Sequence, residues 1–371
     1  MSNVNKKKIV LGMSGGVDSS VSAYLLKKQG YEVIGLFMQN WDTILNNDIN
    51  GHLKGEKKQC NVQKDFSDAK KVADKLKIKL YRIEFIKKYW ENVFKYLLNE
   101  YKNGRTPNPD ILCNKYIKFS EFAKYAKKKF KCDLFAMGHY ANIKTINGIK
   151  YLAKSKSQEN DQTYFLCWLT QEQINNVVFP IGMLTKTKVR EIAKKQNIPT
   201  WNRDNSTGVC FIGERKFKEF LNNYIPYKNG DIYDIVTNKK IGKHQGMMFF
   251  TIGQNKGIGL GGQHEKYFVC KKNIKKNILY VCNEKNKEKY LSSTKCIVKK
   301  INWINKKKPK TNKIDIRFRH RQQLVPGKII TNKKQTILIY KKTLSVTPGQ
   351  FAVFYKKDIC LGGGIVQSII G

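Results

Sequence analysis

The chain has 371 residues, enough for two or three domains with cores of their own. Its 71 Lys and Arg against 28 Asp and Glu give a formal net charge of +43. This charge favours a polyanionic partner. A Lys-rich composition that affects the whole chain evenly would give the same excess without such a partner. No apolar run reaches transmembrane length, and the nine Cys form no Cys-x-x-Cys pair. We therefore expect a cytoplasmic protein without a membrane span, a disulfide framework or a metal site.

The first part of the chain alternates apolar strand patterns with amphipathic helix patterns. Strands are expected at 8–11, 32–38, 79–83, 134–138 and 150–153. Helices are expected at 19–29, 65–76, 90–102, 118–130 and 187–196. Such alternation predicts an α/β fold with a doubly wound parallel sheet. The polar stretch 42–58 is predicted to be a surface loop or lid.

Beyond about residue 212 the pattern changes to short β-strands and turns. A strand at 231–236 and a glycine-dense run at 253–262 predict a small β-rich domain. Further strands at 296–303, 314–318, 336–340 and 351–355, separated by Pro-Gly turns, predict a small C-terminal β-barrel or sandwich. We expect three domains: an ATP-binding domain at 1–211, a central β-rich domain at 212–288 and a C-terminal barrel at 289–371.

A glycine- and serine-rich turn follows the first strand and precedes the first helix, with the sequence Gly-Met-Ser-Gly-Gly-Val-Asp-Ser-Ser at 12–20. A helix N-terminus behind such a turn binds anions through its backbone N–H groups and dipole. Gly15 and Gly16 allow close approach of a phosphate and φ > 0 where it is needed. The turn lacks the Gly-Lys-Ser/Thr ending of a Walker A loop. It resembles the PP-loop of ATP pyrophosphatases.

Two cysteines lie in polar, turn-rich segments that favour a reactive thiolate. Cys113 follows Asp110 by three residues, so the two share one face at the start of a helix. Cys210 lies between glycines in Thr-Gly-Val-Cys-Phe-Ile-Gly. The other cysteines are expected to be small buried side chains.

Together these segments resemble the tRNA-specific 2-thiouridylases (MnmA family). Five more segments agree in order along the chain: 37–41, 138–141, 161–166, 249–254 and 347–355. The resemblance implies an enzyme that binds ATP with Mg²⁺ and a tRNA carrying a wobble uridine. The uracil 2-oxygen is adenylated, and persulfide sulfur, delivered by a sulfur-relay protein or cysteine desulfurase, replaces it. The target base must leave its stack.

The resemblance also implies individual roles. Cys210 carries the persulfide, Cys113 is the thiol that pairs with it in a disulfide bond, and Asp110 is the acid/base partner. The expected ATP contacts are Gly12, Met13, Ser14, Gly15, Gly16, Val17, Asp18, Ser19, Met38 and Gly138. The expected contacts with tRNA and its target base are Asn108, Pro109, Asp110, His139, Asn160, Asp161, Gln162, Arg319, His320 and Gln350.

Some positions depart from the family pattern. Asn160 replaces the usual Lys, and Tyr116 stands where Glu is common. Two other functions stay open: another PP-loop adenylating ligase that modifies tRNA, which would not need Cys113 or Cys210, and a non-catalytic tRNA-binding protein.

Overall fold

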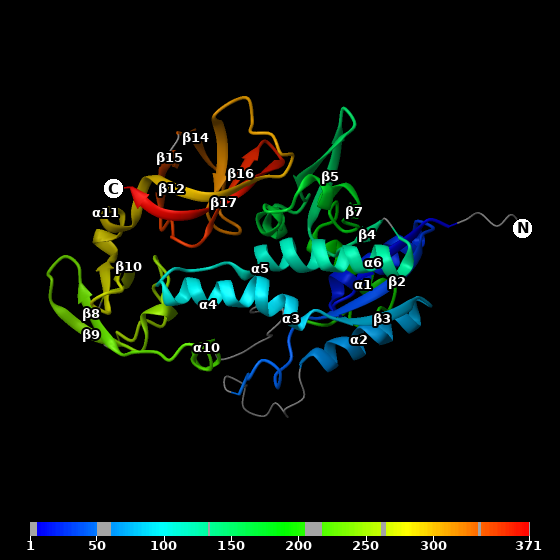
Figure 1. Ribbon diagram of the computed structural model, residues 1–371, viewed down its shortest axis with the longest axis horizontal. Helices are drawn as coiled ribbons and strands as arrows, with labels where there is room; N and C mark the ends of the chain where they lie inside the picture. Colours follow the sequence, from blue (N-terminus) through cyan, green and yellow to red (C-terminus); the bar gives the residue numbers. More distant parts are fainter. Residues whose placement is uncertain are drawn as a thin grey trace, which may run out of the picture.

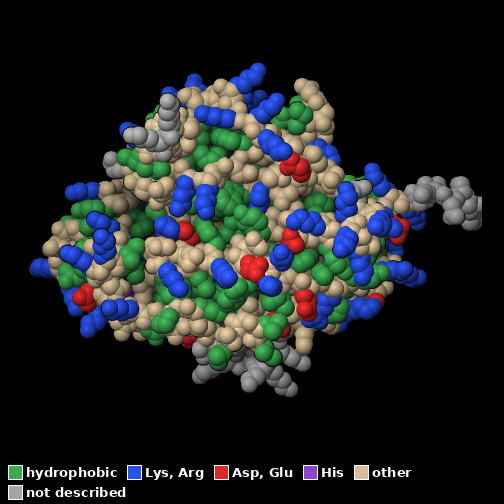
Figure 2. All heavy atoms as spheres, viewed as in Figure 1, with side chains coloured by type: hydrophobic (Ala, Val, Ile, Leu, Met, Phe, Trp, Pro, Cys, Tyr) green, Lys and Arg blue, Asp and Glu red, His purple; other side chains and the backbone are tan. Residues whose placement is uncertain are grey.

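The computed structural model describes residues 6–49, 61–132, 134–204, 217–260, 265–332 and 335–370. Three regions follow one another: an α/β part, a small β-rich part and a β-barrel (Figure 1). Among the described residues, no helix combines the length and apolar character needed to cross a bilayer. Lys and Arg side chains are scattered over the whole visible face (Figure 2).

The α/β part is built on a five-stranded parallel sheet with the order β3-β2-β1-β4-β7. Its strands are β1 Lys8–Gly12, β2 Glu32–Gln39, β3 Lys79–Glu84, β4 Phe135–Ala136 and β7 Val177–Val178. The helices are α1 Val17–Lys28, α2 Asn61–Lys75, α3 Ile86–Tyr89, α4 Lys95–Lys102, α5 Pro109–Leu112, α6 Phe122–Phe130, α7 Thr163–Leu166, α8 Gln171–Asn175 and α9 Lys186–Lys195. Two π-helical segments, Trp90–Phe94 and Cys113–Glu121, join α3 to α4 and α5 to α6.

Alternate residues of β1 enter two different cores. Ile9 and Leu11 are fully buried with side chains of α1 and α9, whereas Val10 is buried with those of α4 and α6. Because successive side chains of a strand point to opposite faces, this arrangement covers both faces of the sheet with helices. The predicted doubly wound sheet is confirmed.

The β-rich part follows α10, Phe217–Asn222. Its sheet has the order β10-β11-β8-β9, with strands β8 Gly230–Asp234, β9 Lys240–His244, β10 Tyr267–Asn273 and β11 Ile278–Asn283. A short helix, α11 Lys287–Leu291, leads into the barrel. The barrel strands are β12 Ser292–Trp303, β13 Lys313–Arg317, β14 Val325–Thr331, β15 Thr336–Leu344, β16 Phe351–Lys356 and β17 Ile359–Ile370, and pairing of β12 with β17 closes it.

One predicted strand is placed differently from the expectation. The segment 150–153 lies within β6 Ile149–Lys154, which forms an antiparallel hairpin with β5 Ala141–Ile146 and extends the barrel sheet through the Ile359–Ala153 pair. Assignment of this strand to the parallel sheet was therefore wrong. Asn147 and Gly148 have φ of 48° and 75°, the geometry of a tight hairpin turn, which turns the chain back on itself.

The barrel shares its core with the α/β part. Phe351 and Tyr355 of β16 lie in the same buried cluster as Leu166 and Trp168. The Trp168 ring packs edge-on against Phe351 at 4.9 Å, and its Nε1 donates to the carbonyl of Gly363 at 3.2 Å. This contact fixes the barrel beside the helices that carry Asp110 and Cys113.

Candidate active site

The predicted phosphate loop connects the end of β1 to the start of α1. The Ser14 N–H donates to Ser19 Oγ at 3.2 Å, and the Ser19 hydroxyl donates to the carbonyl of Gly16 at 3.0 Å. Gly16 is the N-terminal cap of α1, and Asp18 lies in its first turn. The loop is therefore closed by its own side chains at a helix N-terminus, the arrangement that binds anions.

The two glycines of the loop differ in backbone conformation. Gly15 has φ of +78°, and a Cβ built there would lie 2.3 Å from the carbonyl oxygen of Asp65. Gly16 has φ of −85° and ψ of 164°, which any residue adopts. Of the two glycines, only Gly15 uses the positive φ that the sequence had allowed for both.

Asp18 is held by two side chains that the sequence did not indicate. Lys186, the first residue of α9, donates to Asp18 Oδ1 at 2.9 Å and to Oδ2 at 2.7 Å. The Tyr140 hydroxyl donates to Asp18 Oδ1 at 2.9 Å, and burial together with this carboxylate raises the pKa of Tyr140. Lys186 and Asp18 therefore form a partly exposed ion pair beside the loop.

The expected ATP residues outside the loop lie at the same edge of the sheet. A Cβ at Gly138, just after β4, would be 3.1 Å from the backbone N of Ser19. A Cβ at Gly12 would be 3.5 Å from Cε of Met38 on β2. In open α/β sheets, ligands bind at the carboxyl ends of the strands. The structure thus brings Gly12, Met38 and Gly138 together with the loop.

Asp110 and Cys113 lie at the start of a continuous helical run. Asn108 is its N-terminal cap and Pro109 its first residue, where a proline costs no hydrogen bond. Burial raises the pKa of Asp110, while the charge of Lys118 lowers it. Cys113 is 2% exposed and begins the π-helical segment. Cys210, the other predicted thiol, lies outside the described residues.

His139 lies between the loop and this helical run. Its ring contacts Phe119 of the π-helical segment at 5.7 Å between centroids and Phe179 at 6.2 Å. Burial, assisted by the charge of Lys118, lowers the pKa of His139 well below its usual value. In the described structure its Nδ1 is buried without a hydrogen-bond partner. The imidazole is therefore neutral and has a free polar atom.

The segment 160–164 links the phosphate loop to the barrel. Gln162 Oε1 accepts from the backbone N of Tyr140 at 2.9 Å. Asp161 is 1% exposed and forms a buried ion pair with Arg317 at 2.8 Å, so its carboxylate is occupied within the protein. The neighbouring Asn160 donates to Ser157 Oγ at 2.9 Å. The expected contact of tRNA with these three residues stays a prediction.

The remaining predicted tRNA residues make contacts between regions. His320 Nε2 lies 3.1 Å from the carbonyl oxygen of Asp161. Arg319 donates to the carbonyls of Ile252 and Ser345 at 2.7 and 2.9 Å, and burial lowers its pKa. Gln350 Nε2 donates to the carbonyl of Thr106 at 2.9 Å, and Gln350 Oε1 lies 3.5 Å from Asn108 Nδ2. Gln350 and Asn108 are therefore neighbours, although 242 positions separate them.

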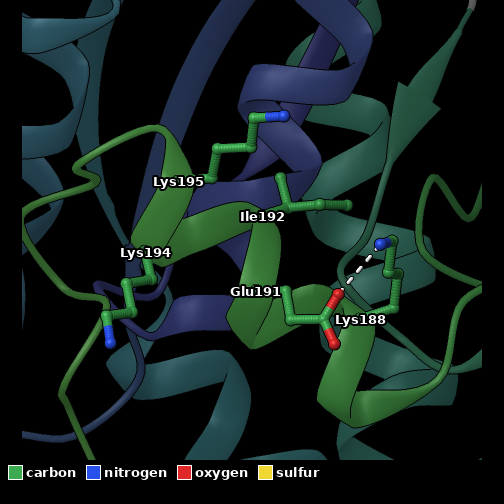
Figure 3. Close-up of a pocket in the computed structure, with 5 residues that line it drawn as sticks. All are labelled: Lys188, Glu191, Ile192, Lys194 and Lys195. Atoms are coloured by element: carbon green, nitrogen blue, oxygen red, sulfur yellow. Dashed lines mark hydrogen bonds and ion pairs between the residues drawn. The ribbon is translucent and has the colours of Figure 1, made fainter.

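A surface pocket lies along α9. Figure 3 shows its lining by Lys188, Glu191, Ile192, Lys194 and Lys195, with an ion pair of 2.8 Å between Lys188 and Glu191. No predicted site residue lines it. We assign it no part in the chemistry.

Comparisons with known proteins cover nearly the whole chain. Residues 7–214 match the family described as tRNA methyl transferase HUP domain, residues 218–283 the tRNA methyl transferase PRC-barrel domain, and residues 293–366 the aminomethyltransferase beta-barrel domain. A solved NMN synthetase from Francisella tularensis is 17% identical, with a TM-score of 0.33, over 55% of this chain and 68% of that one, a likeness too low to bear on function.

Curated relatives are far more similar. The tRNA-specific 2-thiouridylase MnmA of Ureaplasma urealyticum serovar 10 is 52% identical over 97% of this chain and 96% of its own length. The protein of the same name from Mycoplasma mycoides subsp. mycoides SC is 51% identical over 98% of this chain and 100% of its own. The predicted resemblance is confirmed: the chain belongs to the tRNA-specific 2-thiouridylase (MnmA) family.

Proposed function

We propose that this protein is a tRNA-uridine 2-sulfurtransferase that converts the wobble uridine of tRNA to 2-thiouridine, with ATP consumed to AMP and pyrophosphate. One observation carries the proposal. The phosphate loop and the helix start at Asp110 and Cys113 belong to one connected framework, because Gln162 holds Tyr140 beside Asp18 while Tyr164 reaches Gln350 at 3.4 Å. The segment 162–164 thus contacts Tyr140 beside the phosphate loop and, through Gln350, the loop that precedes Asp110 and Cys113.

The phosphate loop supplies the activating half of the reaction. Backbone N–H groups at the start of α1 bind the β- and γ-phosphates of ATP, next to the ion pair of Lys186 with Asp18. The uracil 2-oxygen attacks the α-phosphorus and pyrophosphate leaves. Mg²⁺ would enter bound to the ATP phosphates, whose oxygens are the ligands it prefers, and would neutralise part of their charge.

The two cysteines supply the sulfur-transfer half. The terminal sulfur of a persulfide on Cys210 attacks the uracil C2, and AMP leaves with the former 2-oxygen. The Cys113 thiolate then attacks Sγ of Cys210 and breaks the sulfur–sulfur bond, which leaves 2-thiouridine and a Cys113–Cys210 disulfide. Asp110 lies three residues before Cys113, and its raised pKa suits it to hold or release a proton during this exchange. The donor of the persulfide is a separate sulfur-relay protein or cysteine desulfurase.

Transfer assays on purified protein test this function. Unmodified tRNA with a wobble uridine is incubated with ATP and a persulfide source, and the digested nucleosides are analysed by mass spectrometry. We expect 2-thiouridine in the complete reaction and none without ATP. If tRNA is adenylated but the unchanged protein forms no 2-thiouridine, the protein is another adenylating ligase, and its activity should survive both Cys113→Ser and Cys210→Ser. If no pyrophosphate is released, it is a tRNA-binding protein without catalysis.

A further inference from the structure

The loop at 103–108, between α4 and α5, is held by all three regions of the protein. From the β-rich part, Lys272 Nζ on β10 donates to the carbonyl of Gly104 at 3.1 Å. From the barrel side, Gln350 donates to the carbonyls of Thr106 and Pro107 at 2.9 and 3.2 Å. The loop ends at Asn108, the cap of the helix that carries Asp110 and Cys113. Contacts made by distant regions therefore set where this helix begins.

Gly104 is shaped for its contact with the β-rich part. Its φ is +65°, and a Cβ there would lie 2.8 Å from Cγ1 of Ile274. The next residue is tied to α4, since the Arg105 N–H donates to the carbonyl of Glu100 at 2.9 Å and their side chains form an ion pair at 2.6 Å. With Gly104 fixed on one side and Arg105 on the other, the loop has little freedom to shift.

Lys272 is an unusual donor for such a contact. Its side chain is half-buried, and burial lowers the pKa of the ammonium to about 8. A partly buried charge is costly unless it is hydrogen-bonded, and the Gly104 carbonyl supplies an acceptor. The preceding residue, Lys271, is exposed, with its Nζ 5.9 Å from the Tyr280 ring centroid. Two adjacent lysines on one strand therefore have different surroundings.

We infer that Lys272 is a positioning residue for thiolation: from the β-rich part it fixes the 103–108 loop, and so the placement of Asn108 and Asp110 around the target uridine. This role rests on the proposed function. It acts through the backbone of Gly104, without contact of Lys272 with the reacting atoms. Loss of the donor frees the loop and misplaces Asp110, which lowers the rate of chemistry while tRNA and ATP still bind.

Three variants separate this role from others. Lys272→Met keeps the length and apolar stem but removes the donor, Lys272→Arg retains a donor, and Lys271→Met is the matched control on the same strand. We expect Lys272→Met to lower kcat for 2-thiouridine formation about tenfold, with the KM for tRNA and the Kd of tRNA within about twofold. Lys272→Arg restores most of the rate, and Lys271→Met leaves it unchanged.

A second measurement does not depend on activity. Trypsin cleaves after Arg105, within the loop, and we expect faster cleavage there in Lys272→Met than in Lys271→Met or the unchanged protein. If Lys272→Met fails to fold, Gly104→Ala replaces it, because its Cβ would meet Ile274 and displace the same loop. We expect that variant to show the same fall in kcat and the same faster cleavage.

The possible outcomes distinguish a positioning role from direct tRNA binding and from failure of the proposed function. A rise in the Kd of tRNA with an unchanged kcat would make Lys272 a phosphate contact and overturn the inference, as would equal tryptic cleavage and equal rates in all variants. An unchanged protein that makes no 2-thiouridine would refute the proposed function, whereas the cleavage comparison would still show whether Lys272 holds the loop.

Discussion

Replacement of Gly15 by Ala tests whether the phosphate loop depends on one backbone conformation. The change places a Cβ on a residue with φ of +78°, where non-glycine residues are strained by about 1–2 kcal/mol. That Cβ also lies 2.3 Å from the backbone carbonyl oxygen of Asp65 and 3.1 Å from Nη1 of Arg203. Since a backbone atom cannot rotate away, α2 or the loop must shift, at an overpacking cost of about 1–3 kcal/mol.

The two costs sum to about 2–5 kcal/mol. For the α/β part, matched over residues 7–214, each kcal/mol corresponds to roughly 2–4 °C in Tm, so we expect Gly15→Ala to lower Tm without ATP by about 4 °C or more. Gly16→Ala is the control for stability, because φ there is −85° and its Cβ would meet nothing closer than Ser14 Oγ at 3.5 Å.

Thermal unfolding without ATP measures the loss of stability. Titration of tRNA-dependent pyrophosphate release with ATP measures the effect on ATP use. Gly15→Ala shifts the loop away from the helix N-terminus, so we expect kcat/KM for ATP to fall by about 30-fold or more, as a loss of about 2 kcal/mol implies. The reasoning is refuted if Gly15→Ala unfolds at the same temperature as Gly16→Ala and uses ATP as well as the unchanged protein.

Three further predictions concern other parts of the site. Cys210→Ser should abolish 2-thiouridine formation while tRNA-dependent pyrophosphate release persists, because the thiol acts after activation; retained thiolation would contradict this. Arg317→Met should lower the free energy of unfolding by about 3–5 kcal/mol in denaturant titrations, since it leaves Asp161 buried and unpaired. Asp358→Asn, which removes an exposed ion pair, should lower the free energy of unfolding by less than about 1 kcal/mol. Equal losses in Arg317→Met and Asp358→Asn would contradict the argument from burial. His139 has a lowered pKa in the folded state, so below about pH 6.5 the unfolded chain binds more protons than the folded protein. The free energy of unfolding therefore decreases as the pH is lowered through this range. His139→Phe should therefore reduce the pH slope of the unfolding free energy between pH 5 and 6.5 by up to about 1.4 kcal/mol per pH unit, whereas parallel curves would contradict it.

The phosphate loop was predictable because its signals are local. An apolar strand, two glycines and a helix start within a few positions specify the turn without any distant contact. The same holds for Pro109 at the first position of its helix. The π-helical segment that begins at Cys113 was not foreseen, because its residues have the periodicity of an ordinary helix.

Side chains that support the site were not predictable, because they come from distant positions. Lys186 reaches Asp18 across 168 positions, and Arg317 pairs with Asp161 across 156. The sequence around Lys186 and around Arg317 does not distinguish these two residues from the other basic residues, of which the chain has 71 in all. The strand at 150–153 was misassigned for the same reason: β17, with which its sheet continues, is at the other end of the chain.

The shared core of the α/β part and the barrel has a consequence for synthesis on the ribosome. The cluster that contains Leu166 and Trp168 is completed by Phe351, Val353 and Tyr355, which are translated near the end. Until these residues emerge, the nascent chain exposes apolar surface on its helices and an unpaired edge at β6. The growing polypeptide is thus a natural client for chaperones, and premature termination before residue 351 leaves an aggregation-prone fragment instead of a smaller working enzyme.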